Sequence, residues 1–169
     1  MLSANREINF YIFSSFNYLF KKQMPAGKNS IMMKMKKTIP ALPVQDIKQS
    51  MEFYTTKLGF TVRHHDDGFC IVVRDEVEIH LWKSGDETWK NKGAALATDP
   101  VCSGAESFLA GTASCRIEVQ GIDELFEEYR KQGVIYNPGT VVEEQPWGDR
   151  EFPALDHHRN LLTFYEQIN

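Results

Sequence analysis

An eleven-residue stretch occurs twice in this sequence, first as Val44-Gln-Asp-Ile-Lys-Gln-Ser-Met-Glu-Phe-Tyr54 and again as Val119-Gln-Gly-Ile-Asp-Glu-Leu-Phe-Glu-Glu-Tyr129. Val, Gln, Ile, Glu and Tyr recur at matching positions, 75 residues apart. Each copy has the pattern of a strand that leads into a helix, and Gly59 or Gly133 follows as a helix stop signal. In the first copy, Asp46 and Gln49 also have the spacing of a helix capping box. The sequence therefore predicts a duplicated structural unit.

Extended segments follow both predicted helices. In the first copy, the turn residues Asp66-Asp-Gly68 and Asp75-Glu76 separate strands predicted at Thr61–His65, Phe69–Arg74 and Val77–Lys83. We predict an α+β fold of two tandem βαβββ units, whose curved mixed sheets enclose a cleft. The elements expected in the second copy are a strand at Ala113–Val119, a helix from about Ile122 to Gln132, and strands at Thr140–Glu144, Arg150–Leu155 and Leu161–Glu166.

The composition changes near residue 38. A linker-like segment precedes this point, so residues 1–37 are expected to be an extension outside the domain, which spans residues 38–169. The repeats then cover about residues 38–84 and 112–169. The segment between them, Ser84–Thr112, carries Trp89 and Phe108 and is long for a loop without structure. Loops of this length are typically functional lids or disordered segments.

Charge is distributed unevenly along the chain. The whole sequence of 169 residues has a formal net charge of −4, but residues 1–37 hold seven basic residues and one acidic residue, which leaves −10 for residues 38–169. An acidic domain repels the phosphates of nucleic acid, so we expect no nucleic-acid partner. The field favours a cationic small molecule, although simple solubility explains the charge equally well.

Cysteine content and hydropathy indicate the compartment. Cys70, Cys102 and Cys115 are odd in number and form no Cys-x-x-Cys pattern, so we interpret them as small buried hydrophobic residues in a reducing compartment. The most apolar run, from Phe10 to Phe20, is interrupted by polar residues and is shorter than the roughly 20 residues of a membrane span. We expect a cytoplasmic protein without a membrane partner.

From Thr38 onward the sequence resembles the bleomycin-resistance proteins of the vicinal-oxygen-chelate superfamily. The most discriminating match is Gln145-Pro-Trp-Gly148 followed by Arg150-Glu-Phe152. One departure is Asp156-His-His-Arg-Asn160, where such proteins usually have an Asp-Pro-Asp-Gly-Asn turn, and His157 and His158 are expected to be exposed there. Further matching segments are Ile39-Pro-Ala-Leu-Pro-Val44, Phe53-Tyr54, Leu58-Gly-Phe60, Asp67-Gly-Phe69, Ile79-His-Leu-Trp82 and Arg116-Ile-Glu-Val119.

The superfamily also contains metal-dependent enzymes, so the resemblance leaves a glyoxalase-like or dioxygenase-like activity as the alternative. The metal-ligand positions of those enzymes correspond here to Ile39, His80, Ser114 and Thr163. A catalytic divalent ion normally needs three protein ligands, and only His80 is a strong one. His64 and His65 do not add a site, because neighbouring strand residues point to opposite faces. We expect no metal, no cofactor and no catalytic residue.

A binding surface is what the residues then favour. Flat apolar side chains suit a planar group such as the bithiazole of bleomycin, and acidic side chains suit its cationic tail. Trp82 and Phe69 could equally be core residues, and Glu143 and Glu144 could be a solvated rim. Trp147 lies between Pro146 and Gly148 in a predicted loop, a position that favours ligand stacking over a place in the core. The predicted ligand-binding residues are Trp147, Trp82, Phe69, Asp66, Asp67, His80, Trp89 and Phe108.

The resemblance implies stoichiometric binding of bleomycin-family drugs without chemical modification. It also implies a homodimer that exchanges its N-terminal strand, and Pro40 and Pro43 suit an edge or exchanged strand because proline lacks a ladder donor. A protein of the same fold that binds a different ligand is a third possibility.

Overall fold

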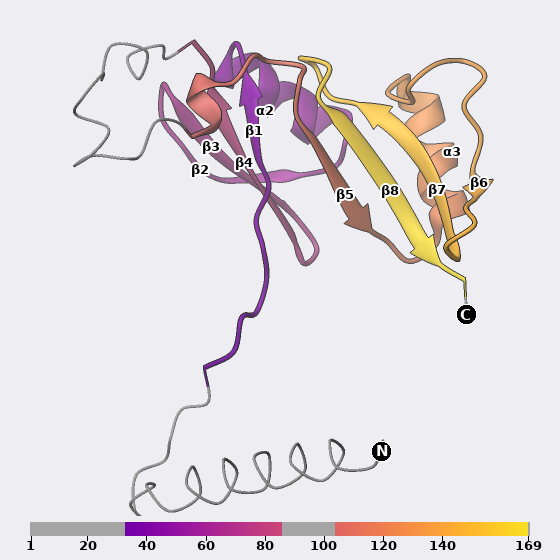
Figure 1. Ribbon diagram of the computed structural model, residues 1–169. Coiled ribbons are helices and arrows are strands. Elements are labelled where there is room, and N and C mark those ends of the chain that lie inside the picture. Colours follow the sequence, from indigo (N-terminus) through magenta and orange to yellow (C-terminus); the bar gives the residue numbers. More distant parts are fainter. Residues whose placement is uncertain (1–32, 86–103, 169) are drawn as a thin grey trace, which may run out of the picture. The chain divides into compact units, whose positions relative to one another are not determined.

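The computed structural model describes residues 33–85 and 104–168. The chain divides into two units, Met1–Lys37 and Thr38–Asn169, and the second contains two four-stranded sheets (Figure 1). The first sheet consists of β1 (Ala41–Val44), β2 (Thr61–His65), β3 (Phe69–Arg74) and β4 (Val77–Lys83), with helix α2 (Ile47–Thr56). The second consists of β5 (Ser114–Glu118), β6 (Glu143–Glu144), β7 (Asp149–Leu155) and β8 (Leu161–Gln167), with helix α3 (Ile122–Gln132), and the short 3-10 helix η3 (Ala105–Ser107) precedes it.

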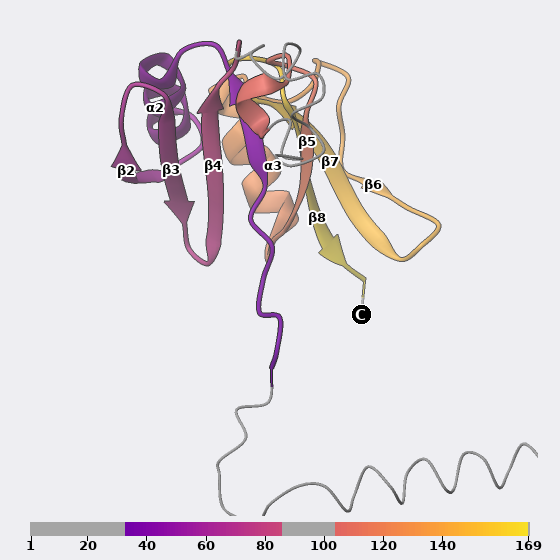
Figure 2. The same ribbon diagram turned by 60° about the vertical axis from the view of Figure 1, so that its left-hand side comes forward.

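The two sheets have the same topology. Their strand orders are β1-β4-β3-β2 and β5-β8-β7-β6, and in each the first pair is parallel while the others are antiparallel. Each helix packs on one face of its own sheet, as two views show (Figures 1 and 2). The prediction of two tandem βαβββ units with mixed sheets is therefore confirmed.

Most predicted boundaries agree with the observed elements, and β6 is the main exception. It covers only Glu143–Glu144, whereas a strand was predicted over Thr140–Glu144. The reason is a turn in which the Thr140 amide donates to the Asn137 carbonyl at 3.0 Å and the Asn137 amide donates to Thr140 Oγ1 at 3.1 Å. These bonds use backbone groups that a longer strand would need for pairing.

The Gly133 stop signal is observed, but the predicted capping box is only half formed. Asp46 is the N-cap of α2 and its side chain accepts from the Gln49 amide at 2.8 Å. The Asp46 amide donates to His158 Nε2, and Gln49 Oε1 lies 3.0 Å from His157 Nε2. Gly133 ends α3 in the left-handed region with a φ of 69°. Helix α2, however, ends at Thr56, before Gly59. Gly59 still has a φ of 71°, so it serves the turn that leads to β2.

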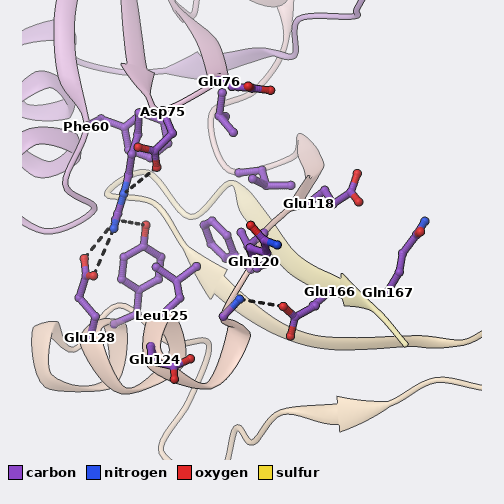
Figure 3. Close-up of a pocket in the computed structure, with 17 residues that line it drawn as sticks. Phe60, Asp75, Glu76, Glu118, Gln120, Glu124, Leu125, Glu128, Glu166 and Gln167 are labelled. Carbon is purple, nitrogen blue, oxygen red and sulfur yellow. Dashed lines mark hydrogen bonds and ion pairs between the residues drawn. The ribbon is translucent and has the colours of Figure 1, made fainter. Parts of the chain in front are cut away.

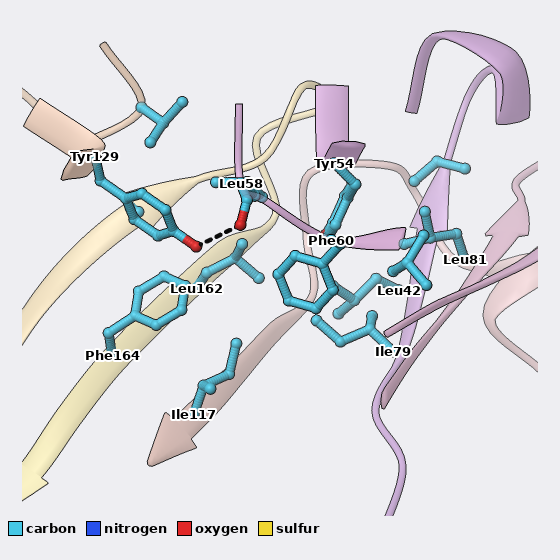
Figure 4. Close-up of a cluster of buried hydrophobic side chains, with 14 of the residues drawn as sticks. Leu42, Tyr54, Leu58, Phe60, Ile79, Leu81, Ile117, Tyr129, Leu162 and Phe164 are labelled. Atoms are coloured by element: carbon cyan, nitrogen blue, oxygen red, sulfur yellow. Dashed lines mark hydrogen bonds between the residues drawn. The ribbon is translucent and has the colours of Figure 1, made fainter. Parts of the chain in front are cut away.

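A single hydrophobic core joins the two repeats (Figure 4). Its side chains come from the helices and from the helix-covered face of each sheet, as the alternation of strand side chains requires. Cys70 is fully buried among them, as expected for a small hydrophobic residue, while Cys115 is half-buried and Cys102 lies outside the described residues. The largest members are Tyr54, Phe60, Tyr129, Phe152 and Phe164.

The turn at Asp156–Asn160 also ties the repeats together. The Asn160 side-chain amide donates to the Pro43 carbonyl of β1 at 2.8 Å, and both Asn160 and Asp156 are buried. Arg159 has a φ of 69°, in the left-handed region. His157 is exposed as expected, but His158 is half-buried, because its Nε2 accepts from the Asp46 amide at 3.4 Å.

None of the helices in the described parts of the chain is long and apolar enough to cross a membrane.

Candidate functional site

Three predicted residues meet on the first sheet, on the face turned away from α2. Phe69 on β3 lies directly across from Trp82 on β4, with ring centroids 4.4 Å apart. The His80 and Phe69 rings are perpendicular, and their centroids are 5.1 Å apart. All three are half-buried and none belongs to the hydrophobic core. Phe69, His80 and Trp82, here called the aromatic cluster, thus form an apolar surface on the sheet face opposite α2.

A charged group borders the aromatic cluster. The Glu78 carboxylate accepts two hydrogen bonds from Arg63, at 2.6 and 3.1 Å. Its Oε1 also lies 3.0 Å from His80 Nε2. The imidazole is therefore oriented by a carboxylate, and this nitrogen is already engaged.

The two acidic residues that precede Phe69 are exposed, and one has a clear structural role. Asp66 Oδ1 accepts from the amides of Gly68 and Phe69 at 2.7 and 2.8 Å. This arrangement is an Asx turn, which fixes the start of β3. Asp67 is exposed beside it. Both carboxylates lie next to the aromatic cluster in sequence, but the Asp66 carboxylate stabilises the turn.

Trp147 lies on the other sheet, in the turn between β6 and β7. Its side chain is 61% exposed, and Gly148 has a φ of 92°, which glycine tolerates in a tight turn. The indole Nε1 donates to Asp149 Oδ2 at 3.1 Å. The ring is therefore exposed to solvent but attached to the sheet at its edge.

An arginine crosses the face of the second sheet that is opposite α3. Arg116 on β5 extends over Tyr165 of β8, with its guanidinium carbon 4.7 Å from the ring centroid. It reaches two carboxylates on β7, Asp149 at 2.7 Å and Glu151 at 2.9 Å. The same guanidinium carbon lies 5.9 Å from the Trp147 ring centroid. Burial and the nearby Glu118 and Asp149 carboxylates raise the pKa of Tyr165 above its ordinary value. Arg116, Trp147, Asp149, Glu151 and Tyr165 form what we call the arginine cluster.

The sequence predicted Trp147 as a ligand-binding residue, but it did not single out the other four members of the arginine cluster. A signal was present, because Arg116 and Glu118 alternate with the buried Ile117, and Asp149 and Glu151 precede the buried Phe152. This alternation places the charged residues on one sheet face. The order β5-β8-β7, which brings them together, cannot be read from the alternation.

The other candidate residues lie outside both clusters or outside the described part of the chain. Phe108 is exposed just after η3, and Glu143 and Glu144 are exposed on β6. Trp89 lies outside the described residues. Phe108, Glu143 and Glu144 are therefore not part of the aromatic cluster or of the arginine cluster.

The positions equivalent to metal ligands offer few donors. Ser114 and Thr163 lie on β5 and β8, but their hydroxyls are poor ligands, and the Ile39 side chain has no donor atom. Over residues 33–85 and 104–168, no group of three or more His, Cys, Asp or Glu side chains could hold a metal ion. His80 is thus the one strong ligand among the four inherited positions.

A cavity of about 790 Å³ lies between the two repeats, and none of the predicted ligand-binding residues that the structure describes lines it (Figure 3). Its floor contains Phe60 and Phe164 from the core. Arg74 on its wall donates to Glu128, to the Tyr129 hydroxyl and to the Leu58 carbonyl. The other carboxylates of the lining are Asp75, Glu76, Glu118, Glu124 and Glu166. The cavity is consequently acidic.

Comparison with known proteins gives the family. The sequence model of the Glyoxalase/Bleomycin resistance protein/Dioxygenase superfamily matches residues 37–164. This chain belongs to that superfamily. It is 51% identical over 134 residues to proteins named bleomycin resistance protein from Geobacillus stearothermophilus and Staphylococcus aureus, covering 79% of this chain and 98% of each relative.

Solved structures of the superfamily share the fold. The bleomycin resistance determinant encoded on transposon Tn5 superposes with a TM-score of 0.58 at 18% identity, covering 79% of this chain and 98% of that one. The bleomycin-binding protein from Streptomyces verticillus, complexed with copper(II)-bleomycin, gives 0.60 at 24% identity, covering 82% and 99%. The family resemblance seen in the sequence is therefore confirmed.

Proposed function

We propose that this protein confers antibiotic resistance by binding bleomycin-family drugs stoichiometrically, without modifying them, and so withholds them from DNA. The observation that carries the proposal is the 51% identity to bleomycin resistance proteins along 98% of their length. The sheet faces opposite the two helices support it, because they offer flat aromatic side chains beside carboxylates. Such surfaces suit a ligand with a planar heteroaromatic group and a cationic tail.

The binding groove is proposed to lie between two subunits. The aromatic cluster lies on the first sheet and Trp147 on the second. Among the described residues, the Trp147 ring contacts none of the rings of the aromatic cluster. A homodimer that exchanges its N-terminal strand would let one sheet of each subunit face the other sheet of its partner. Pro40 and Pro43 support exchange of this segment, because β1 is an edge strand and proline weakens its pairing. Light scattering at micromolar concentration should give the mass of a dimer, and a monomer would contradict this arrangement.

We further propose a cytoplasmic location. Cys70 and Cys115 are free thiols, which is usual in a reducing compartment. Fractionation of cells that express the protein should recover it in the cytoplasmic fraction, and recovery in another fraction would contradict the assignment.

Calorimetric titration with metal-free bleomycin tests the function. We expect saturable binding of one drug per chain, and mass spectrometry should recover the drug with its mass unchanged. Spermidine, which has charge but no aromatic group, is the control ligand and should not compete at equal concentration. Failure to bind bleomycin would refute the proposal.

A metal-dependent enzyme of the same superfamily is the alternative. It predicts one tightly held divalent ion per chain in protein purified without drug, and a change in the mass of a substrate. We expect neither, since His80 is the one strong ligand at the inherited positions. Elemental analysis must precede any contact with bleomycin, because the drug itself chelates copper.

A further inference from the structure

Trp147 is exposed, yet two contacts restrict its orientation, one at the edge of the indole and one over the ring. An exposed tryptophan in a turn can normally adopt several rotamers, and it loses that freedom when a ligand stacks on it. Here the indole Nε1 donates to Asp149 Oδ2 at 3.1 Å, so the ring is held at its polar edge. The hydrogen bond uses only the ring edge, while the Arg116 guanidinium carbon lies over the ring, 5.9 Å from its centroid.

Asp149 is in turn held by Arg116. The Arg116 guanidinium donates to the same oxygen, Asp149 Oδ2, at 2.7 Å, and it also contacts Glu151 at 2.9 Å. Because the arginine comes from β5 and the carboxylates from β7, the bridge crosses β8 between them. The Asp149 side chain is 85% buried by these neighbours, with 15% exposed. It therefore has little freedom to leave the indole.

We propose that Asp149 and Arg116 are positioning residues that hold the Trp147 indole in the orientation that a flat aromatic ligand needs. This inference rests on the proposed function. Preorganisation raises affinity because the ordering of the side chain is complete before the ligand arrives. Ordering one side chain of this kind corresponds to about a 2- to 12-fold change in affinity.

A purely structural role explains the arrangement less well. The Arg116 guanidinium is 43% exposed, so solvent screens its ion pair with the mostly buried Asp149 carboxylate and reduces what the pair adds to stability. Glu151 already gives Arg116 a partner on β7, so the fold does not require Asp149 for that bridge. What Asp149 adds is an acceptor that Arg116 and Trp147 share.

The test uses the full chain, metal-free bleomycin and three single variants. Asp149→Ala removes the shared acceptor, and Trp147→Phe keeps an aromatic ring but removes the N–H donor. Asp123→Ala is the matched control, because it removes another carboxylate that pairs with an arginine of β7, Arg150, at 2.7 Å. The double variant Asp149→Ala with Trp147→Phe completes a mutant cycle. Calorimetry gives the affinities, and ¹⁹F NMR of 5-fluorotryptophan protein reports the Trp147 ring without ligand.

We expect Asp149→Ala to weaken binding by about 2- to 12-fold and to move the Trp147 resonance of the free protein toward that of free 5-fluorotryptophan. Asp123→Ala should change neither. The effect of Trp147→Phe should be smaller in the Asp149→Ala background than in the wild type, because the hydrogen bond is already lost there.

Two results would overturn the inference while leaving the proposed function intact. One is wild-type affinity in Asp149→Ala. The other is weaker binding with an unmoved Trp147 resonance, which would mean that Asp149 contacts the ligand directly or acts through the fold. Failure of the wild-type protein to bind bleomycin would instead refute the proposed function, and this inference with it.

Discussion

Tyr54 and Tyr129 occupy matching positions in the two repeats, and each donates its hydroxyl to the opposite repeat. The Tyr54 hydroxyl donates to Asp156 Oδ2 at 3.3 Å, and the Tyr129 hydroxyl donates to the Leu58 carbonyl at 3.0 Å. Both side chains are at most 1% exposed. Burial raises the pKa of Tyr129 to about 12 and that of Tyr54 well above its ordinary value, so both remain protonated donors at neutral pH.

Replacing either tyrosine with phenylalanine should therefore weaken the contact between the repeats. The acceptors keep other donors, since Asn160 still bonds Asp156 and Arg74 still bonds the Leu58 carbonyl. We expect a loss of about 0.5–1.5 kcal/mol in the free energy of unfolding for each variant, measured by urea denaturation. Tyr136→Phe, at a residue that is 54% exposed, is the control. Variants as stable as this control would show that the hydroxyls contribute nothing.

Arg159 occupies the place of glycine in the usual Asp-Pro-Asp-Gly-Asn turn, and its φ of 69° explains why glycine is preferred there. A non-glycine residue in the left-handed region destabilises the folded protein by roughly 1–2 kcal/mol. Glycine in turn loses more backbone entropy on folding than alanine, which corresponds to about 0.5–1 kcal/mol. Arg159→Gly should accordingly stabilise the protein by up to about 1.5 kcal/mol, with about 0.75 kcal/mol at the centre of the two ranges, in the same urea assay. Arg159→Ala retains the strain and should show no gain, so equal stability of the two variants would contradict the explanation.

The repeat and the turn residues were sufficient to predict the fold. Asp66-Asp-Gly68 and Asp75-Glu76 marked the ends of β2, β3 and β4, because short polar turns leave little choice of register. The half-buried position of His158 and the short β6 were missed. Both depend on a specific hydrogen-bonded turn, and local polarity cannot distinguish such a turn from an exposed loop or a strand.

The candidate site was less predictable than the fold. Trp147 was found because proline and glycine flank it in the chain. Arg116 and Asp149 were missed because their contact spans 33 residues and depends on the strand order of the second sheet. Sequence patterns specify which sheet face a residue takes, but strand order comes from tertiary packing.

Residues 1–37 should be dispensable for drug binding. Their net charge is positive, whereas that of residues 38–169 is negative. The resemblance to bleomycin-resistance proteins also begins after them. In the calorimetric titration, a variant that lacks these residues should bind bleomycin with nearly the same affinity as the full chain. Circular dichroism must confirm that the shortened protein is folded. Lost binding by a folded deletion variant would mean that this segment belongs to the binding site.

Trp147→Ala should weaken bleomycin binding and leave the fold intact. Stacking on an aromatic side chain is worth roughly 1–3 kcal/mol in nucleobase systems, which are comparable flat heteroaromatic ligands. This corresponds to about a 5- to 150-fold loss of affinity, since about 1.4 kcal/mol is tenfold.

Stability separates this role from a structural one. Truncating a buried tryptophan costs about 3–5 kcal/mol, but the Trp147 side chain is 61% exposed, so the melting temperature should change little. Tyr136→Ala is the matched control, because Tyr136 is an aromatic residue of similar exposure outside both clusters, and its affinity should equal that of the wild type. Unchanged affinity of Trp147→Ala together with a large fall in melting temperature would show that Trp147 supports the fold and that the drug binds elsewhere.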